Sequence, residues 1–366
     1  MPPRGRQERK GHMRFGIYCE MQNGIGVDYA RTVGDVLGLI ENADRLGYDV
    51  FSVIDHHFFQ EFSISANPLA LFAAAAQRTR NIRLRTLCHT LPLRNPAVYA
   101  GEMAFADILT GGRLDLGVGR GHAWEYPPAG IPMEETQGRY EEAIEILELA
   151  FTKERFSFRG RYYHFDDVSV VPKPLQKPYP PVYIVGTSGA AFEIGARKGW
   201  SLAFGGPAPV AAFKPGVDRY REACAKYGTK PTVACVRAVY ITEDERQARA
   251  ECEGALRRFF AYNSSPIPSL RRDPAMKQRL LDSNYAFYAG EIMEVLPRLS
   301  YEDIVAQECA FVGTPERVLE QCAALKRMID VDEILIISHY GDIEISKALR
   351  TQELFAREVI PKLRAG

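Results

Sequence analysis

Eight short apolar runs, each of them followed by a helical pattern, constrain the fold of this chain more strongly than any other feature. The runs occupy residues 14–20, 49–55, 82–89, 113–119, 181–186, 200–206, 232–241 and 332–338. Strands that alternate with helices favour a parallel sheet, and eight strand–helix units are typical of a barrel. A chain of 366 residues suits such a barrel with insertions. We therefore predict an α/β fold, a (β/α)8 TIM barrel.

The helical patterns predict helices over about 30–46, from 68 onward, and over 96–109, 138–150, 189–198, 209–227, 244–260, 314 onward and 342–359. Two stretches interrupt the alternation. Residues 156–172 contain two strand-like halves around Arg-Gly-Arg, which predicts a hairpin insertion. Residues 261–312 form a long excursion, which predicts a lid-like segment, with a surface insertion of no functional role as the alternative.

No linker rich in Pro, Gly or Ser divides the chain, so we expect residues 13–366 to form one domain. Residues 1–12 are polar and basic, and we expect them to form a flexible tail. They lack the apolar stretch of a secretory signal, and no run of about 18 apolar residues predicts a membrane span.

Charge and cysteine content exclude further classes of protein. Lys plus Arg and Asp plus Glu are both 46, which gives a net charge of zero and disfavours nucleic acid as a partner. The seven cysteines form no C-x-x-C pair. Reduced thiols in a cytoplasm fit this pattern better than a disulfide framework or a zinc site.

Polar residues follow the second, third and fourth predicted strands, where a barrel collects its catalytic groups. The second strand ends in Asp55-His56-His57, and His89 and His122 follow the next two strands. Neighbouring strand residues point to opposite faces, so we expect only one of the paired histidines to enter the site, the other sharing a face with Asp55. Imidazoles suit proton transfer near neutral pH, so Asp55, His56, His89 and His122 are catalytic candidates.

Three imidazoles at one barrel mouth are also a potential zinc site. The ends of the later strands show no Asp or Glu that would complete a metal-dependent hydrolase site. We therefore expect no metal.

Two glycine-rich loops indicate a phosphorylated cofactor. No helix begins directly after Gly117-Val118-Gly119-Arg120-Gly121, so a dinucleotide fingerprint is not favoured there. Its glycines would instead let a flat ligand approach the backbone, and Arg120 would pair with an anion. Gly186-Thr187-Ser188-Gly189 precedes a helix and has the composition of a phosphate cradle, with simple N-capping as the alternative.

The order and spacing of several motifs resemble those of the bacterial luciferase-like, flavin-dependent monooxygenases. The motifs are Asp-His-His-Phe at 55–58, Asn67-Pro68, Leu91-Pro92, Asn95-Pro96, Gly111-Gly112-Arg113, residues 117–121 and Gly313-Thr314-Pro315-Glu316. The resemblance spans about 14–361 and is densest over 49–121. It implies a (β/α)8 barrel that binds reduced FMN, reacts it with O2 and oxygenates a small organic substrate.

The resemblance also implies roles for single residues. His56 corresponds to the family's active-site histidine, with Asp55 beside it. Arg120 and Arg139, together with the loop of Gly186, Thr187, Ser188 and Gly189, would hold the flavin phosphate. Leu87 and Cys88 match the family's non-proline cis peptide, which supports the flavin. Gly119 adjoins this site and replaces the cysteine of true luciferases, so an oxygenation other than light emission from an aldehyde is favoured.

An apolar pocket is a chemical requirement of this chemistry, because water must be excluded. Phe58, Phe59, Trp124 and Tyr126 are candidates for its wall, with core packing as the alternative. No nicotinamide domain is evident, so a separate NAD(P)H-dependent flavin reductase is expected to supply FMNH2, and relatives suggest a homodimer. The alternative functions are a deazaflavin-dependent dehydrogenase or reductase, a flavin-binding protein without catalysis, and a metal-dependent barrel hydrolase.

Overall fold

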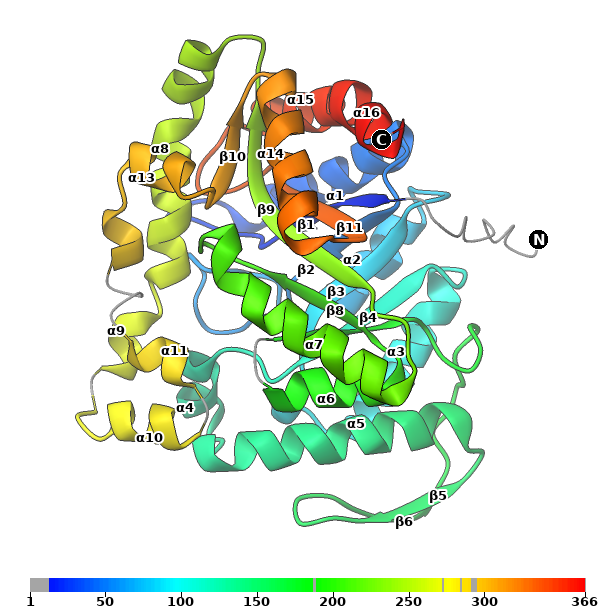
Figure 1. Ribbon diagram of the computed structural model, residues 1–366. Coiled ribbons are helices and arrows are strands. Elements are labelled where there is room, and N and C mark those ends of the chain that lie inside the picture. Colours follow the sequence, from blue (N-terminus) through cyan, green and yellow to red (C-terminus); the bar gives the residue numbers. More distant parts are fainter. Residues whose placement is uncertain (1–12, 187–188, 272, 284, 291–294, 366) are drawn as a thin grey trace.

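Eight parallel strands close into a barrel in the computed structural model, which describes residues 13–365 except 187–188, 272, 284 and 291–294 (Figure 1). They are β1 (Arg14–Cys19), β2 (Val50–Val53), β3 (Arg83–Thr90), β4 (Leu114–Gly119), β7 (Val182–Val185), β8 (Ser201–Gly205), β9 (Val233–Ile241) and β11 (Glu333–Ile337). β9 pairs with both β8 and β11, which closes the ring. The predicted (β/α)8 barrel is confirmed. The predicted tail, residues 1–12, lies outside the described residues.

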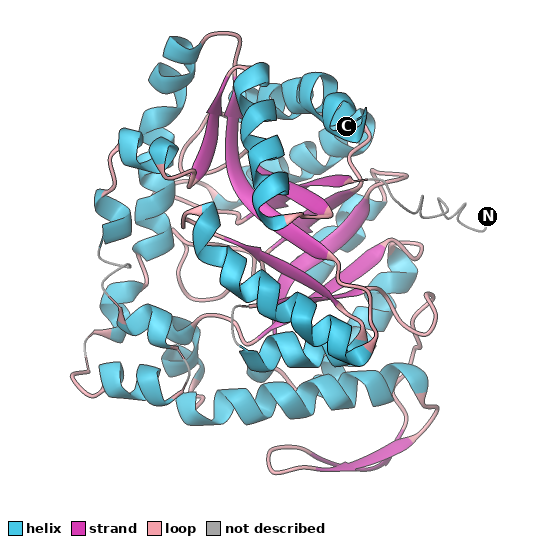
Figure 2. Ribbon diagram, viewed as in Figure 1, coloured by secondary structure: helices cyan, strands magenta, loops and turns pink. Residues whose placement is uncertain are grey.

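Helices surround the strands (Figure 2). The longer ones are α1 (Tyr29–Leu46), α2 (Pro68–Ala76), α3 (Pro96–Leu109), α5 (Thr136–Thr152), α6 (Gly189–Lys198), α7 (Lys214–Tyr227), α8 (Glu245–Ser264), α14 (Pro315–Ile329) and α15 (Ile345–Leu354). A π-helical turn, η6 (Phe355–Val359), and α16 (Ile360–Ala365) close the chain. The short elements are η1 (Leu91–Leu93), η2 (Ala123–Glu125), α4 (Tyr126–Ala129), η3 (Met133–Glu135) and η4 (Val210–Phe213).

Local chemistry explains where several helices begin. The side chains of Asn67, Asn95 and Thr314 each accept a backbone N–H of the helix that follows. A proline stands at the first helical position in all three cases, where its missing N–H costs nothing. These caps are the Asn-Pro and Thr-Pro motifs of the sequence, so they fix the first residues of α2, α3 and α14.

The two insertions have different structures. Residues 156–172 contain the predicted hairpin, in which β5 (Phe156–Arg159) and β6 (His164–Val168) pair antiparallel. The hairpin extends away from the barrel along the side covered by α5 (Figure 1).

The segment predicted near 261–312 is largely helical where the structure describes it. It begins inside α8 and continues through α9 (Ile267–Leu270), α10 (Met276–Asp282), α11 (Ala286–Ala289), η5 (Leu296–Arg298) and α13 (Tyr301–Ala306). It ends in an unpredicted strand, β10 (Ala310–Gly313), which pairs parallel with the last residues of β9. Four apolar residues before a helix cap are too short a run to distinguish a strand from a loop.

Charged side chains fill the amino-terminal end of the barrel. Arg85 on β3 is fully buried and donates to Asp115 on β4 at 3.1 Å and to Glu333 on β11 at 2.6 Å. Its guanidinium also lies 3.7 Å from the ring centroid of Tyr183 on β7. Arg14 on β1 approaches Glu333 at 3.6 Å. These contacts join five strands at the end opposite to the cavity described below.

Among the described residues, no helix combines the length and the apolar character needed to cross a membrane.

Candidate active site

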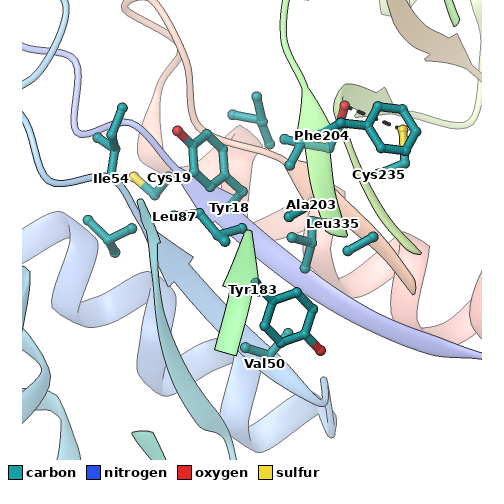
Figure 3. Packing of buried hydrophobic residues seen from close by; sticks show 14 of the residues in the cluster. Tyr18, Cys19, Val50, Ile54, Leu87, Tyr183, Ala203, Phe204, Cys235 and Leu335 are labelled. Atoms are coloured by element: carbon teal, nitrogen blue, oxygen red, sulfur yellow. Dashed lines mark hydrogen bonds between the residues drawn. The ribbon is translucent and has the colours of Figure 1, made fainter. Parts of the chain in front are cut away.

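A cavity of about 340 Å³ opens at the carboxyl ends of the barrel strands. This volume is within the range of small-molecule sites. Tyr18, Ile54, Leu87 and Phe204 line it from four different strands or strand ends. Figure 3 shows these four side chains among the buried residues packed between the strands. Further lining residues are Glu20, Phe62, Cys88, Arg120, Gly121, His122, Trp124, Gln137, Tyr140, Val185, Gly186, Ala191, Ala203, Gly205, Gly206, Pro207, Ala208, Phe213, Val236, Asn263, Tyr285, Tyr288, Leu296 and Ile337.

The peptide bond between Leu87 and Cys88 is cis, at the position that the resemblance indicates. Both residues line the cavity. Gly119 lies directly behind them. A Cβ atom at this position would lie 2.5 Å from the Cys88 sulfur and 2.9 Å from the carbonyl oxygen of Val185. The backbone here therefore has no room for a side chain, including the cysteine of true luciferases.

His122 is the histidine that faces the cavity. Its ring stacks on Trp124, with centroids 4.4 Å apart and planes at 4°. Its Nδ1 atom lies 2.8 Å from the hydroxyl oxygen of Tyr288. Burial lowers the pKa of His122 to about 4. The imidazole is therefore neutral near pH 7 and is available to accept or donate a single proton.

His56 lies one layer behind this wall. It is 1% exposed and packs against Phe62, with ring centroids 4.3 Å apart. Trp124 Nε1 donates to His56 Nε2 at 2.9 Å. An indole N–H only donates, so Nε2 is the acceptor and the imidazole proton resides on Nδ1. Burial, together with the neighbouring His122, lowers the pKa of His56 well below its usual value.

Asp55 and His89 belong to a separate buried cluster that does not line the cavity. Asp55 accepts from His57 Nε2 at 3.2 Å, from the Tyr99 hydroxyl at 3.3 Å and from Arg94 at 3.4 Å. His89 Nδ1 contacts the same Tyr99 hydroxyl. Burial alone raises the pKa of Asp55, but hydrogen bonds from both histidines and the charge of Arg94 hold it below its usual range. His57 thus lies on the same side as Asp55, although β2 already ends at Val53.

Glu125 is a buried carboxyl that the sequence patterns did not single out. Its two oxygens accept the backbone N–H groups of His57 and His122, both at 3.1 Å. One side chain thus joins the loops that follow β2 and β4. Burial raises the pKa of Glu125 to about 8. The sequence signal that could have identified Glu125 is a capping box, which begins here with His122 in place of the usual serine or threonine.

The predicted phosphate-binding residues are partly brought together. Arg120 lines the cavity, and its guanidinium donates to the Ser283 carbonyl at 2.8 Å and lies 3.9 Å from the Tyr285 ring centroid. Gly186 also lines the cavity, and Gly189 begins α6. Thr187 and Ser188 lie outside the described residues. Arg139 on α5 pairs with Glu135 on η3 at 2.7 Å and is not a lining residue.

Aromatic rings form much of the wall. Of the predicted rings only Trp124 lines the cavity. Tyr126 is a fully buried core residue, Phe59 packs against the core, and Phe58 is 58% exposed. Tyr285 and Tyr288 come from the 261–312 segment, so this segment contributes directly to the site. Which of its residues reach the cavity could not be predicted, because the sequence does not specify the course of a long insertion.

The lining fits a flat cofactor that carries an anion. Glycine backbones at 121, 186, 205 and 206 replace side chains around a mainly apolar space, and Arg120 supplies a cation. The same residues are less suited to binding a metal ion. Within the described ranges, no group of three or more His, Cys, Asp or Glu side chains is placed to hold a metal ion.

Comparison with known proteins agrees with this geometry. A family profile described as luciferase-like monooxygenase matches residues 13–331. The chain is 26% identical over 344 residues to the oxygenase component of a flavin-dependent trigonelline monooxygenase from Acinetobacter baylyi, covering 87% of this chain and 94% of that protein. It is 27% identical over 357 residues to an FMNH2-dependent dimethylsulfone monooxygenase from Pseudomonas putida, covering 94% and 90%.

A relative of another activity matches a smaller part of the chain. It is an F420-dependent glucose-6-phosphate dehydrogenase from Intrasporangium calvum, 33% identical over 181 residues, which cover 44% of this chain and 53% of that protein. Among solved structures, the monooxygenase RslO1 from Streptomyces bottropensis superimposes with a TM-score of 0.80 at 25% identity, covering 96% of this chain and 99% of that one. With a family profile that spans most of its length, this chain belongs to the luciferase-like monooxygenase family.

Proposed function

We propose that this chain is the oxygenase component of a two-component monooxygenase that uses FMNH2 and O2 to oxygenate a small organic substrate. The observation that carries the proposal is the cavity of about 340 Å³, which combines the cis peptide, an apolar wall, one cation and one neutral imidazole. The similarity to monooxygenases that use reduced flavin supports the same reading.

The residues present would hold the cofactor in two parts. Leu87 and Cys88 would contact the flavin ring, and Arg120 would pair with its phosphate. Gly186 and Gly189, with Thr187 and Ser188 as the resemblance implies, would complete the phosphate site. When bound, the reduced flavin supplies the electrons that activate O2.

The side chains of the wall have two tasks. Tyr285 and Tyr288 cover the cavity from the side of the 261–312 segment and exclude water, which protects reactive oxygen species from side reactions. His122 holds or moves a proton at the Nε2 atom, because its Nδ1 atom already faces the Tyr288 hydroxyl. His56 and Trp124 act as positioning residues that hold the His122 ring.

The cofactor assignment is tested by anaerobic titration with FMNH2, reduced riboflavin and reduced deazaflavin F420. We expect FMNH2 to bind most tightly. Arg120→Ala should weaken FMNH2 binding about tenfold or more, because a charge-assisted hydrogen bond contributes roughly 1.5–3 kcal/mol. The same variant should leave binding of riboflavin, which has no phosphate, nearly unchanged. Tighter binding of F420 than of FMNH2 would favour the deazaflavin-dependent alternative.

Catalysis and the need for a partner are tested together by oxygen uptake. We expect the purified chain alone not to turn over with NADH or NADPH, and an added NAD(P)H-dependent flavin reductase to start turnover. Rapid NAD(P)H-driven turnover by the chain alone would contradict the two-component proposal. Retention of FMN without formation of any product would favour a binding protein without catalysis.

Apolar side chains on α3 support the expected homodimer. Val98 is 62% exposed, Phe105 54% and Ile108 41%. We propose that a second copy covers them, because water contact with such a patch is unfavourable. Phe105→Glu should shift the sedimentation coefficient to that of a monomer, whereas a wild-type chain that sediments as a monomer would contradict the proposal. A cytoplasmic location stays a prediction.

A further inference from the structure

Glu20 is a buried carboxyl in the wall of the cavity that the proposed chemistry does not use. It follows β1, two residues after Tyr18, and alternate residues of an extended chain share a face. Both side chains accordingly line the cavity. Glu20 is 6% exposed, so it is largely removed from bulk water while it lines this space.

Two amide groups hold one oxygen of Glu20. Gln22 Nε2 donates to Oε2 at 3.0 Å, and Asn263 Nδ2 donates to the same atom at 3.1 Å. The orientation of each amide is fixed elsewhere. Gln22 Oε1 accepts the Gly341 N–H at 2.8 Å, and Asn263 Nδ2 also donates to the Phe259 carbonyl at 3.0 Å. The two N–H groups must therefore point at Glu20.

The other oxygen, Oε1, has no hydrogen-bond partner among the described residues, and it is not one of the fully enclosed polar atoms that lack a partner. Because the side chain lines the cavity and Oε2 is held by the two amides, we infer that Oε1 is the oxygen open to the cavity. A carboxyl with one oxygen fixed by two donors and the other directed into a binding space is a preorganised acceptor.

No cation compensates this carboxyl in the described part of the chain. No lysine, arginine or histidine described in the structure forms an ion pair with Glu20, and the titratable neighbours that sense its charge are Tyr18 and Cys19. Burial raises the pKa of Glu20 to about 8, against the opposing hydrogen bond from Asn263. An ionised carboxylate in such a place is costly until a positive charge joins it.

We propose that Glu20 is a specificity-determining residue that binds a positively charged nitrogen of the substrate. Rings of Tyr18, Phe62 and Tyr288 line the same cavity, and aromatic faces attract organic cations. Arg120 also lines the cavity, but its charge is assigned to the cofactor phosphate. The inference rests on the proposed function, because it places the substrate in the space that the flavin shares.

One consequence separates this site from simple packing. Glu20 is protonated in the free protein near neutral pH and must ionise to pair with a cation, so cation binding releases a proton. A cation that does not itself titrate should bind more tightly as the pH rises toward 8, by up to about tenfold per unit. A neutral ligand of the same shape should show no such dependence.

The test compares N-methylpyridinium, a permanent cation, with toluene, its neutral isostere. Both are titrated calorimetrically into the wild-type chain and into Glu20→Gln, each with saturating FMN and again without FMN. We expect the wild-type chain to bind N-methylpyridinium at least tenfold more tightly than the variant does. Toluene and FMN should bind equally to both chains. The exposed Glu145→Gln serves as the matched control and should behave as wild type.

Equal affinity of wild type and Glu20→Gln for N-methylpyridinium would overturn the inference while leaving the flavin proposal intact. Absence of FMN binding to the wild-type chain would instead overturn the proposed function, and the titrations without FMN would still report on the cation site. If the variant does not fold, the wild-type pH dependence decides. An N-methylpyridinium affinity that stays constant from pH 6 to 8 would refute the role of Glu20.

Discussion

At the amino-terminal end of the barrel, Asp115 and Glu333 are buried beside Arg85, whereas at the carboxyl end Glu20 and Glu125 are buried beside amide groups. All four carboxyls are at least nine-tenths removed from solvent. Their pKa values nevertheless shift in opposite directions. Burial raises the pKa of Asp115 and Glu333, but the surrounding arginines outweigh it and lower both. Burial is not outweighed at Glu20 and Glu125, where both pKa values rise to about 8.

The difference shows that depth does not decide the charge of a buried acid; the partners do. The lower network, formed by Arg85, Asp115 and Glu333 at the amino-terminal end, pairs its charged groups with one another. It therefore has no unpaired charge that could bind a ligand. Glu20 and Glu125, at the carboxyl or upper end, keep their protons because the described residues place no cation beside them, and the imidazole of His122 is likewise neutral. Groups whose protonation can still change are therefore collected at the end where barrels hold their active sites.

The largest effect should follow from breaking the lower network. Arg85→Met keeps much of the side-chain volume but leaves Asp115 and Glu333 buried without their shared cation. Removing one partner of a buried pair costs about 3–5 kcal/mol. Urea unfolding should show this loss in the free energy of unfolding, and binding of FMNH2 to the folded fraction should persist. A loss below about 1 kcal/mol would mean that the two ends do not differ as described.

A smaller effect, on rate rather than stability, is expected at the upper end. His122→Phe preserves the stack on Trp124 but removes the imidazole nitrogens. Oxygenation should fall about 100-fold, the lower range of general acid–base contributions, and FMNH2 binding should change little. Since the pKa of His122 is about 4, this residue should not itself cause any fall in the wild-type rate between pH 6 and 8.

His164→Phe, on the exposed hairpin, is the matched control for His122→Phe and should leave the rate unchanged. A second comparison uses His56→Ala, which should lower oxygenation more than FMNH2 binding because it releases Trp124. If His56→Ala abolished oxygenation while His122→Phe did not, the proton-transfer role would belong to His56.

The contrast between the two ends also shows what the sequence could reveal. Strands buried on both faces are mainly apolar runs, so the eight barrel strands were predictable, as was the position of Asp55-His56 at a strand end. The sequence could not predict which imidazole faces the cavity, because β2 ends at Val53 and the alternation of side chains ends before His56. Glu20 and Tyr288 were missed for another reason. They belong to no motif, and the fold alone brings a strand end and an inserted helix to one cavity.

A third prediction concerns the pH dependence of stability. Because folding raises the pKa of Glu20 to about 8, its contribution is fully present below its unfolded pKa near 4.3 and is lost as the pH rises to 8. Glu20→Gln should therefore make the fall in stability over that window shallower, by at most about 1.4 kcal/mol per pH unit. Urea midpoints at several pH values measure it. If the variant showed the same pH dependence of stability as the wild type, Glu20 would not be the group that holds the proton in the folded state.

The smallest effect should come from an ion pair that resembles the lower network in distance alone. Arg159 and Asp166 on the hairpin approach to 2.6 Å, as Arg85 and Glu333 do, but their side chains are 72% and 76% exposed. Water already solvates both charges, so Arg159→Met should change the free energy of unfolding by no more than about 0.5 kcal/mol. Added salt should weaken this pair and hardly affect the buried one. A cost for Arg159→Met close to that of Arg85→Met would show that pairing distance, rather than exclusion of water, sets the strength of both contacts.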